Sequence, residues 1–261
     1  MSVNSHLTNL ASTLVLSEKE KLSIAVSIST LSSRLDAHFG SIVDSHFRFG
    51  SSTRGTILPH QIDNHSDIDC MVVFNTIDGQ KKPQTYLDRL RRFVESRYSR
   101  SEIRQSHPTI VLSLNHIKFE LVPAIESYSY QIPSPGSSWI EWTSTDPSSA
   151  NQSLEEKNKN NNYQIKPLVR LIKYWNTCNR YPFSSFAIEQ YIVEKTFLRC
   201  SGLKDYFYEF WSGFDYKYDA AQNTKNMVDN AKNYSRRAKE YENENMPVHA
   251  EIEIKKIVLP L

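Results

Sequence analysis

Five residues in the first half of the chain have types and spacing that suit phosphate and metal chemistry: Gly50, Ser51, Asp67, Asp69 and Glu120. Successive side chains of a strand point to opposite faces, so Asp67 and Asp69 project from the same side of an apolar strand. Two like charges this close need compensation where they are partly buried. Hard divalent cations such as Mg²⁺ supply it, because they prefer oxygen ligands. We therefore predict that Asp67 and Asp69 are metal ligands.

Glu120 is the candidate third metal ligand. The apolar residues of its predicted strand, Ile117, Phe119 and Leu121, alternate with Lys118 and Glu120. Glu120 therefore points away from the apolar face. Two metal ions roughly 3.5–4 Å apart stabilise the attacking and leaving oxygens of an in-line displacement at phosphorus. The three carboxylates thus predict two Mg²⁺ or Mn²⁺ ions in a catalytic site.

Gly50 and Ser51 are the candidate phosphate-binding residues. They follow a predicted strand over residues 44–49 and precede a short polar stretch that could begin a helix. Glycine permits a close approach of the backbone, and N–H groups at a helix start bind phosphate. The Ser51 hydroxyl adds one donor. Together with the metals, this turn predicts a site that holds a nucleoside triphosphate and transfers a nucleotidyl group.

The simplest interpretation of each motif alone is structural, because a Gly-Ser pair is usually a turn and Asp-x-Asp is often a solvated turn. A calcium loop that began at Asp67 would need glycine at its sixth position. That position is Val72, so the calcium interpretation fails. The ordered set of turn, Asp-x-Asp strand and later glutamate is much rarer by chance than its parts, and it favours nucleotidyl transfer.

Composition and charge limit the class of protein. A chain of 261 residues can form one large domain or two lobes, and its net charge of +2 predicts no strong binding of duplex nucleic acid. The N-terminal residues lack the basic start and apolar core of a signal peptide, and no apolar run approaches the roughly 20 residues of a membrane span. Three cysteines without a C-x-x-C pair fit a reducing compartment. We therefore expect a cytoplasmic protein.

The first half of the chain has the pattern of a mixed sheet with helices. Ser17 and Glu20 form a capping box before an apolar series with helical spacing, which predicts a helix over residues 17–39. Pro83 begins a second predicted helix. The predicted strands are 44–49, one that begins at Asp67, 109–115 and 117–123. Residues 1–130 are therefore predicted to form the catalytic lobe.

The second half has a different pattern. Residues 131–164 are rich in Ser, Pro and Asn, which is typical of a crossover. Residues 165–261 are predicted to be helical, and the expected helices are 166–177, 185–199, a stretch near 203–211, and 219–241. The predicted fold class is α+β, with an α/β lobe followed by a helical lobe.

The helical lobe has candidate nucleotide-binding residues of its own. Lys166, Arg170 and Lys173 stand at i, i+4 and i+7, which places three cations along one side of a helix. In an isolated helix such a row is most simply a solvated face, whereas opposite a triphosphate it would neutralise the departing pyrophosphate. Ser185 is most simply an N-cap, but a hydroxyl at a helix N-terminus also binds anions. Phe186 could stack on a base.

With both lobes placed, the chain resembles the bacterial CD-NTase family of cyclic-oligonucleotide synthases. These are relatives of animal cyclic GMP–AMP synthase and oligoadenylate synthase, within the DNA polymerase β-like nucleotidyltransferase superfamily. The resemblance rests on residues 49–56, 66–69, 120–124, 167–176 and 183–189, and it extends to the closing residues 238–261. It implies a polymerase β-like nucleotidyltransferase lobe with a C-terminal helical lobe.

The resemblance also implies a function. The expected activity is the template-independent joining of nucleoside triphosphates into a short cyclic or linear signalling oligonucleotide. The expected biology is bacterial antiphage defence, with a separately encoded effector that senses the product. The roles implied are donor-triphosphate contacts for Gly50, Ser51, Lys173 and Ser185, metal ligation for Asp67, Asp69 and Glu120, and base stacking for Phe186.

Other functions stay open. A linear polymerase could be primed on its own hydroxyl, for which Tyr234 and Tyr241 are candidates. An antitoxin-type enzyme would instead transfer the nucleotidyl group to a protein or a transfer RNA. A catalytically inactive nucleotide-binding module is disfavoured, because all three carboxylates are present. A duplex-DNA sensor is disfavoured by the small charge excess and by the lack of zinc-ligand spacing.

Overall fold

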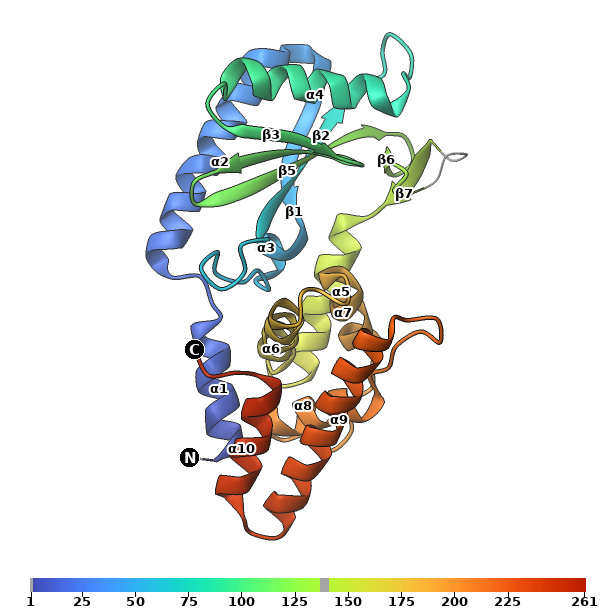
Figure 1. Ribbon diagram of the computed structural model, residues 1–261. Coiled ribbons are helices and arrows are strands. Elements are labelled where there is room, and N and C mark those ends of the chain that lie inside the picture. Colours follow the sequence, from blue (N-terminus) through green and yellow to red (C-terminus); the bar gives the residue numbers. More distant parts are fainter. Residues whose placement is uncertain (1, 137–140) are drawn as a thin grey trace. The chain divides into compact units, whose positions relative to one another are not determined.

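The chain forms two compact units, shown in Figure 1 for the computed structural model, which describes residues 2–136 and 141–261. Residues Leu16–Gln152 form the sheet unit, and residues Met1–Val15 with Ser153–Leu261 form the helical unit. These limits differ from the predicted ones at both ends. Residues 1–15 group with the helical unit, and most of the predicted crossover belongs to the sheet unit. Residues 137–140 of that crossover lie outside the described residues.

The sheet unit is built on a mixed sheet, as predicted. Its order is β1-β2-β5-β4-β3, with β6 paired to β5 and β7 paired to β6. Only the neighbours β2 and β5 run parallel among the described strands. The strands are β1 (Val43–Phe49), β2 (Asp67–Phe74), β3 (Glu102–Ser106), β4 (Thr109–Leu114), β5 (Ile117–Glu126), β6 (Tyr130–Pro133) and β7 (Trp142–Thr145). The helices are α2 (Glu18–Phe39), α3 (Gly50–Arg54) and α4 (Pro83–Arg97), with a 3-10 turn over Gly40–Ile42.

One face of this sheet is covered by α2 and α4. Their apolar residues pack in one buried cluster with the alternate residues Ile68, Cys70, Val72 and Phe74 of β2. The remaining residues of β2 therefore point to the opposite face, where Met71 and Val73 form a separate small cluster with Ala124 of β5. The packing of α2 and α4 thus decides which face of the sheet receives the acidic residues of β2.

Local signals set several element boundaries. The Glu20 carboxylate accepts a hydrogen bond from the Ser17 N–H at 2.9 Å, and the Ser17 hydroxyl accepts one from the Glu20 N–H at 3.3 Å. This reciprocal capping box begins α2 one residue after Ser17, as predicted. Pro83 is likewise the first residue of α4.

The predicted crossover contains regular structure that the sequence did not indicate. Strands β6 and β7 lie in it, and helix α5 (Pro147–Asn160) follows them. The Asp146 carboxylate accepts hydrogen bonds from the N–H groups of Ser148 and Ser149, at 3.0 Å each. Ser and Asn dominate α5 and hide its helical period, so the capping aspartate was the usable signal.

The helical unit is formed by α1 (Val3–Thr13), α6 (Ile165–Cys178), α7 (Ser185–Glu194), α8 (Leu203–Gly213), α9 (Gln222–Asn243) and α10 (Pro247–Ile257), with most of α5. Helix α1 packs on α6, α8 and α10, which is why the first residues group with this unit. Its buried core includes Leu168, Leu171 and Ile172 of α6 and Phe207 and Trp211 of α8. Helix α7 ends at Glu194, five residues before the predicted end. No helix in the described ranges is long and apolar enough to cross a membrane.

Candidate active site

The sheet brings the three predicted carboxylates onto one face. Ile68 is 1% exposed and points into the helix-covered core, so Asp67 and Asp69 point to the other face. The parallel register of β2 and β5 places Asp69 beside Glu120 and Asp67 beside Lys118. Residues paired in register share a face, so Glu120 stands next to Asp69 on the acidic face.

Gly50 and Asp69 are in close contact. Phe49 pairs with Asp69 at the end of β1, and Gly50 follows with a φ of +72°. A Cβ atom at position 50 would lie 1.8 Å from Oδ2 and 2.7 Å from Cγ of Asp69. Only glycine therefore allows the Asp69 carboxylate to occupy this place, and the turn and the carboxylate form one structural unit.

Helix α3 holds this turn in position. The Thr53 hydroxyl donates to the carbonyl of Gly50 at 2.9 Å, and the Thr56 N–H donates to the carbonyl of Ser51 at 3.1 Å. Arg54 is buried, and its guanidinium donates to the Asn151 side chain of α5 at 3.5 Å. The sequence indicated a helix start just after Ser51, whereas α3 begins at Gly50, and it gave no sign of the support from Asn151.

Glu120 has a perturbed acidity. Burial raises the pKa of its carboxyl group above the ordinary value of 4.5, and contacts with Thr109, Arg104 and Lys118 oppose that rise. Arg104 pairs in register with Val111, which pairs with Glu120, so the three lie in one row across β3, β4 and β5. Arg104 was missed because β3 was missed, and the alternation of polar and apolar residues in that strand was the available signal.

The donor chemistry of the acidic face suits Mg²⁺, which prefers carboxylate oxygens. The Gly50 backbone forms a cradle for the Asp69 carboxylate that a Cβ atom would fill, so the fold accommodates a charged group at this point. Within residues 2–136 and 141–261, however, no three His, Cys, Asp or Glu side chains already form a group that could hold a metal ion. The three carboxylates therefore lie on one face of the sheet, but they do not form a ready-made metal site among the described residues.

The predicted row of cations in the helical unit is not a solvated face. Lys173 is 5% exposed and forms an ion pair with Glu189 of α7, which is 3% exposed. Lys166 pairs with Glu155 of α5. Arg170 donates to the carbonyl of Ala11 at 3.4 Å, and burial lowers the pKa of its guanidinium. Each cation thus has a partner in its own unit, which i, i+4 spacing does not reveal.

Helix α7 begins at Ser185, as predicted, but its N-cap is one residue earlier than predicted. The N-cap is Ser184, whose hydroxyl accepts a hydrogen bond from the Ala187 N–H at 3.1 Å. Ser185 is the first helical residue and is exposed, and Phe186 is 48% exposed. The loop before α7 is held by Asn176, which donates to the carbonyl of Phe183 at 2.8 Å and accepts from its N–H at 3.1 Å. Asn176 is a positioning residue that the sequence did not indicate.

The candidate primer tyrosines of α9 both pack against α10. The Lys256 ammonium lies 5.2 Å from the centre of the Tyr234 ring. The rings of Tyr241 and His249 are 5.4 Å apart. Both tyrosines are partly buried, so each has an ordinary packing role.

Comparison with known proteins gives one family match. The family model for the Second Messenger Oligonucleotide or Dinucleotide Synthetase domain matches residues 1–158. A Bacillus cereus (strain VD146) protein described as a probable cyclic nucleotide synthase is 34% identical over 105 residues. That match covers 37% of this chain and only 31% of the relative.

Several solved structures share the fold. The DncV cyclic AMP-GMP synthase of Vibrio cholerae with the linear intermediate 5′ pppA(3′,5′)pG has a TM-score of 0.76 at 12% identity, covering 99% of this chain and 96% of that one. CdnC of E. coli MS115-1 with ATP has a TM-score of 0.72 at 13% identity, covering 98% and 97%. The CdnE cyclic dinucleotide synthase of Elizabethkingia meningoseptica with GTP and Apcpp has a TM-score of 0.65 at 17% identity, covering 89% and 98%. At these identities the likeness concerns the fold alone.

Proposed function

We propose that this chain, which belongs to the family of second messenger oligonucleotide or dinucleotide synthetase domains, joins nucleoside triphosphates into a short signalling oligonucleotide without a template. The observation that carries this proposal is the contact of Gly50 with Asp69, which stands in register beside Glu120. A phosphate-binding turn built against a metal-binding carboxylate is what nucleotidyl transfer requires.

The residues of the sheet unit take the following roles. The backbone of Gly50 and the hydroxyl of Ser51 bind the donor triphosphate. Asp67, Asp69 and Glu120 would hold two Mg²⁺ ions, which stabilise charge at the reacting phosphate when bound. The carboxylates repel one another without cations, so metal and triphosphate would bind together. Arg104 and Lys118 oppose the rise in the pKa of Glu120, and so favour the ionised carboxylate that metal binding needs.

The helical unit has candidate nucleotide-binding residues of its own. The exposed Ser185 contacts triphosphate oxygens, and the exposed Phe186 stacks on a base. Lys173 is buried in an ion pair with Glu189. It therefore binds a phosphate only if that phosphate replaces the Glu189 carboxylate as its partner. Lys166 and Arg170 are assigned to the departing pyrophosphate under the same condition.

The solved relatives support nucleoside triphosphates as substrates. The structure of the DncV cyclic AMP-GMP synthase holds a linear intermediate, which supports stepwise joining. The structures of CdnC with ATP and of CdnE with GTP and Apcpp support purine triphosphates as substrates. A role in antiphage defence and a separate product-sensing effector belong to the same proposal and rest on the family.

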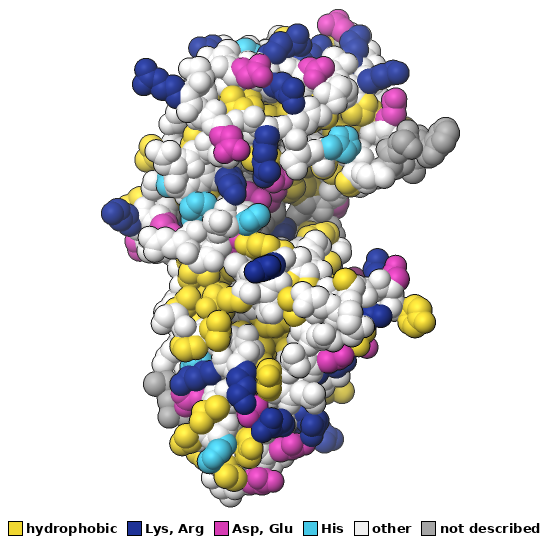
Figure 2. Space-filling view, viewed as in Figure 1, with side chains coloured by type: hydrophobic (Ala, Val, Ile, Leu, Met, Phe, Trp, Pro, Cys, Tyr) yellow, Lys and Arg dark blue, Asp and Glu magenta, His cyan; other side chains and the backbone are white. Residues whose placement is uncertain are grey.

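Figure 2 shows Lys and Arg interspersed with Asp and Glu over the visible face, which supports the expectation of no strong duplex binding.

The test is an incubation of the purified chain with labelled ribo- and deoxyribonucleoside triphosphates, with Mg²⁺ or Mn²⁺, followed by mass spectrometry. A cyclic or short linear oligonucleotide supports the proposal, and the Asp67→Asn/Asp69→Asn protein is the control. Label attached to the chain would indicate self-priming, which the packing of Tyr234 and Tyr241 against α10 disfavours. Label on an added protein or transfer RNA, without free oligonucleotide, would replace the proposal with the antitoxin-type reaction.

A further inference from the structure

The exposed start of α7 is joined to α6 by a turn over residues 179–184, and both helices belong to the helical unit. Ser185 and Phe186, which are proposed to contact the triphosphate and the base, are the first two residues of α7. A binding side chain is effective only where the surrounding contacts hold its backbone and rotamer in place. The contacts of this turn therefore bear on how the base of a nucleotide is bound.

The turn contains two strained residues. Arg180 and Tyr181 have φ values of +62° and +57°, a left-handed conformation that residues with a side chain seldom adopt. Their N–H groups donate to the carbonyls of Thr177 and Asn176 at 3.1 and 2.8 Å, which ends α6. The turn is thus built without a glycine. Strain of this kind persists only where other contacts over-determine it, and it concentrates at functional sites.

Asn176 and Phe183 supply the contacts that hold this turn. The Asn176 side chain is buried, and it satisfies both backbone groups of Phe183, donating to the carbonyl at 2.8 Å and accepting from the N–H at 3.1 Å. The Phe183 ring stacks on Trp175 with centroids 6.3 Å apart and meets the ring of Phe214 edge-to-face at 5.0 Å. Phe183 is therefore fixed through its backbone and through its ring, three residues before Phe186.

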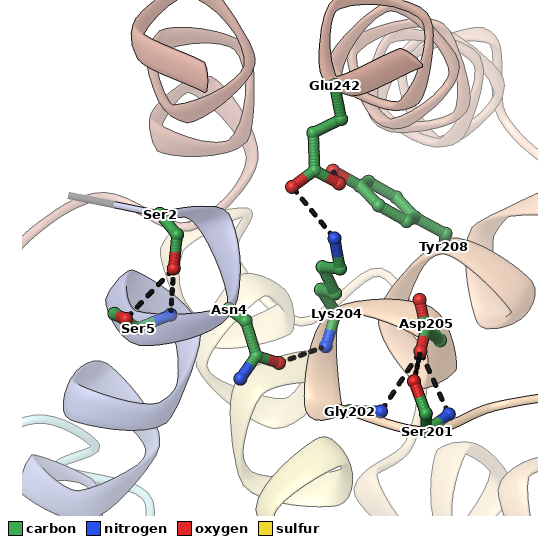
Figure 3. A network of polar contacts seen from close by, with 9 residues as sticks. All are labelled: Ser2, Asn4, Ser5, Ser201, Gly202, Lys204, Asp205, Tyr208 and Glu242. Carbon is green, nitrogen blue, oxygen red and sulfur yellow. Dashed lines mark hydrogen bonds and ion pairs between the residues drawn. The ribbon is translucent and has the colours of Figure 1, made fainter. Parts of the chain in front are cut away.

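A second asparagine of the helical unit makes a comparable bond away from the residues proposed to bind nucleotide. Figure 3 shows the Asn4 side chain of α1 accepting a hydrogen bond from the backbone N–H of Lys204 in α8, at 3.1 Å. This bond joins two helices, and neither residue has a role in the proposed nucleotidyl transfer. Asn4 is therefore a structural reference for Asn176, because its loss should lower stability and leave nucleotide affinity unchanged.

We propose that Asn176 and Phe183 set the position of Phe186, and that the turn over residues 179–184 thereby determines how tightly the base of a nucleoside triphosphate is bound. Asn176 and Phe183 are positioning residues, since they act through Phe186 and not by touching the nucleotide. This inference rests on the proposed function and deepens it, because it assigns base recognition in the helical unit to a strained turn and the two residues that hold it.

The test is a double-mutant cycle on nucleotide affinity, measured by calorimetric titration of the whole chain with Apcpp. Phe186→Ala should weaken binding about tenfold or more, which is the size of effect that loss of base stacking produces. Asn176→Ala should weaken binding about tenfold where Phe186 is present. In the Phe186→Ala chain the same change should weaken binding less than about threefold, because the residue through which Asn176 acts is gone.

A second variant decides the question even if Asn176→Ala does not fold. Phe183→Leu keeps the two backbone bonds to Asn176 and removes the ring contacts with Trp175 and Phe214. Its loss of affinity for Apcpp should likewise depend on the presence of Phe186.

Asn4→Ala is the matched control, and it should lower the midpoint of urea denaturation while binding Apcpp like the unaltered chain. The inference is overturned if Asn176→Ala and Phe183→Leu bind Apcpp as Asn4→Ala does, or if their losses are the same with and without Phe186. An unaltered chain that binds no Apcpp overturns both the inference and the proposed function. A chain that binds Apcpp with the expected dependence on Phe186 but forms no oligonucleotide overturns the proposed reaction alone.

Discussion

Replacing Gly50 by alanine tests the contact on which the proposed site depends. Gly50 and Gly55 border the same short helix and have nearly equal φ values of +72° and +70°. A left-handed conformation costs a residue with a side chain roughly 1–2 kcal/mol. At position 55 a Cβ atom would meet nothing within 4 Å, whereas at position 50 it would lie 1.8 Å from Asp69 Oδ2. Gly55→Ala is therefore a matched control that has the backbone strain without the collision.

The collision with Asp69 lowers the free energy of unfolding further. The Asp69 side chain must leave its rotamer to admit the new methyl group, at about 0.5–1.5 kcal/mol. We expect Gly50→Ala to lower the free energy of unfolding by roughly 1.5–3.5 kcal/mol and Gly55→Ala by roughly 1–2 kcal/mol, measured by urea denaturation. Nucleotidyl transfer should fall at least about a hundredfold in Gly50→Ala, because Asp69 is displaced, and stay near normal in Gly55→Ala.

A double-mutant cycle isolates the contact. With Asp69→Ala present there is no carboxylate to displace, and only the Cβ atom of residue 69 stays near the new methyl group, at 3.1 Å, so Gly50→Ala should then destabilise the chain little more than Gly55→Ala does. The coupling between positions 50 and 69 should be about 0.5–1.5 kcal/mol. Additive effects, or equal activity in the two alanine variants, would refute the reasoning.

Three further changes test the remaining parts of the site. Asp67→Asn with Asp69→Asn should abolish transfer and leave the melting temperature equal or higher, because repulsion between the carboxylates is removed; residual product would refute the metal assignment. Lys173→Ala should destabilise the chain by about 3–5 kcal/mol, because it leaves Glu189 charged and buried, and a melting temperature like that of the unaltered chain would show that the pair is dispensable. Glu120→Gln should keep triphosphate binding in calorimetry while single-turnover transfer falls by several powers of ten. Since burial raises the pKa of Glu120, the native state holds that proton to higher pH than the unfolded chain, so stability should fall as pH rises from 4.5 through the native pKa, and Glu120→Gln should remove that fall.

The Lys173 prediction reverses what the sequence suggested. The spacing of Lys166, Arg170 and Lys173 favours a charged face, and loss of Lys173 would then leave the helical unit intact. In the structure Lys173 is buried against Glu189. Charge spacing on one helix does not say which face the neighbouring helices cover, and α7 supplies a carboxylate at that point.

The sequence by itself determined those features that depend on neighbours in the chain. Alternation along β2 and β5 placed the carboxylates opposite apolar residues, and the Ser17 capping box and Pro83 set the starts of α2 and α4. The order of the Gly-Ser turn, the Asp-x-Asp strand and Glu120 favoured nucleotidyl transfer, and together with the motifs of the helical lobe it indicated the family. These signals survive without tertiary contacts because strand alternation and capping act within a few residues.

Only the tertiary structure decided what depends on distant contacts. The register of β2 with β5, which sets Asp69 beside Glu120, joins residues about 50 positions apart and has no local signature. The collision of a Cβ atom at position 50 with Asp69 depends on how β1 pairs with β2. The place of α1 in the helical unit depends likewise on packing against α6, α8 and α10. In each case the deciding energy comes from burial and pairing between separate segments, and a pattern read along one segment does not contain it.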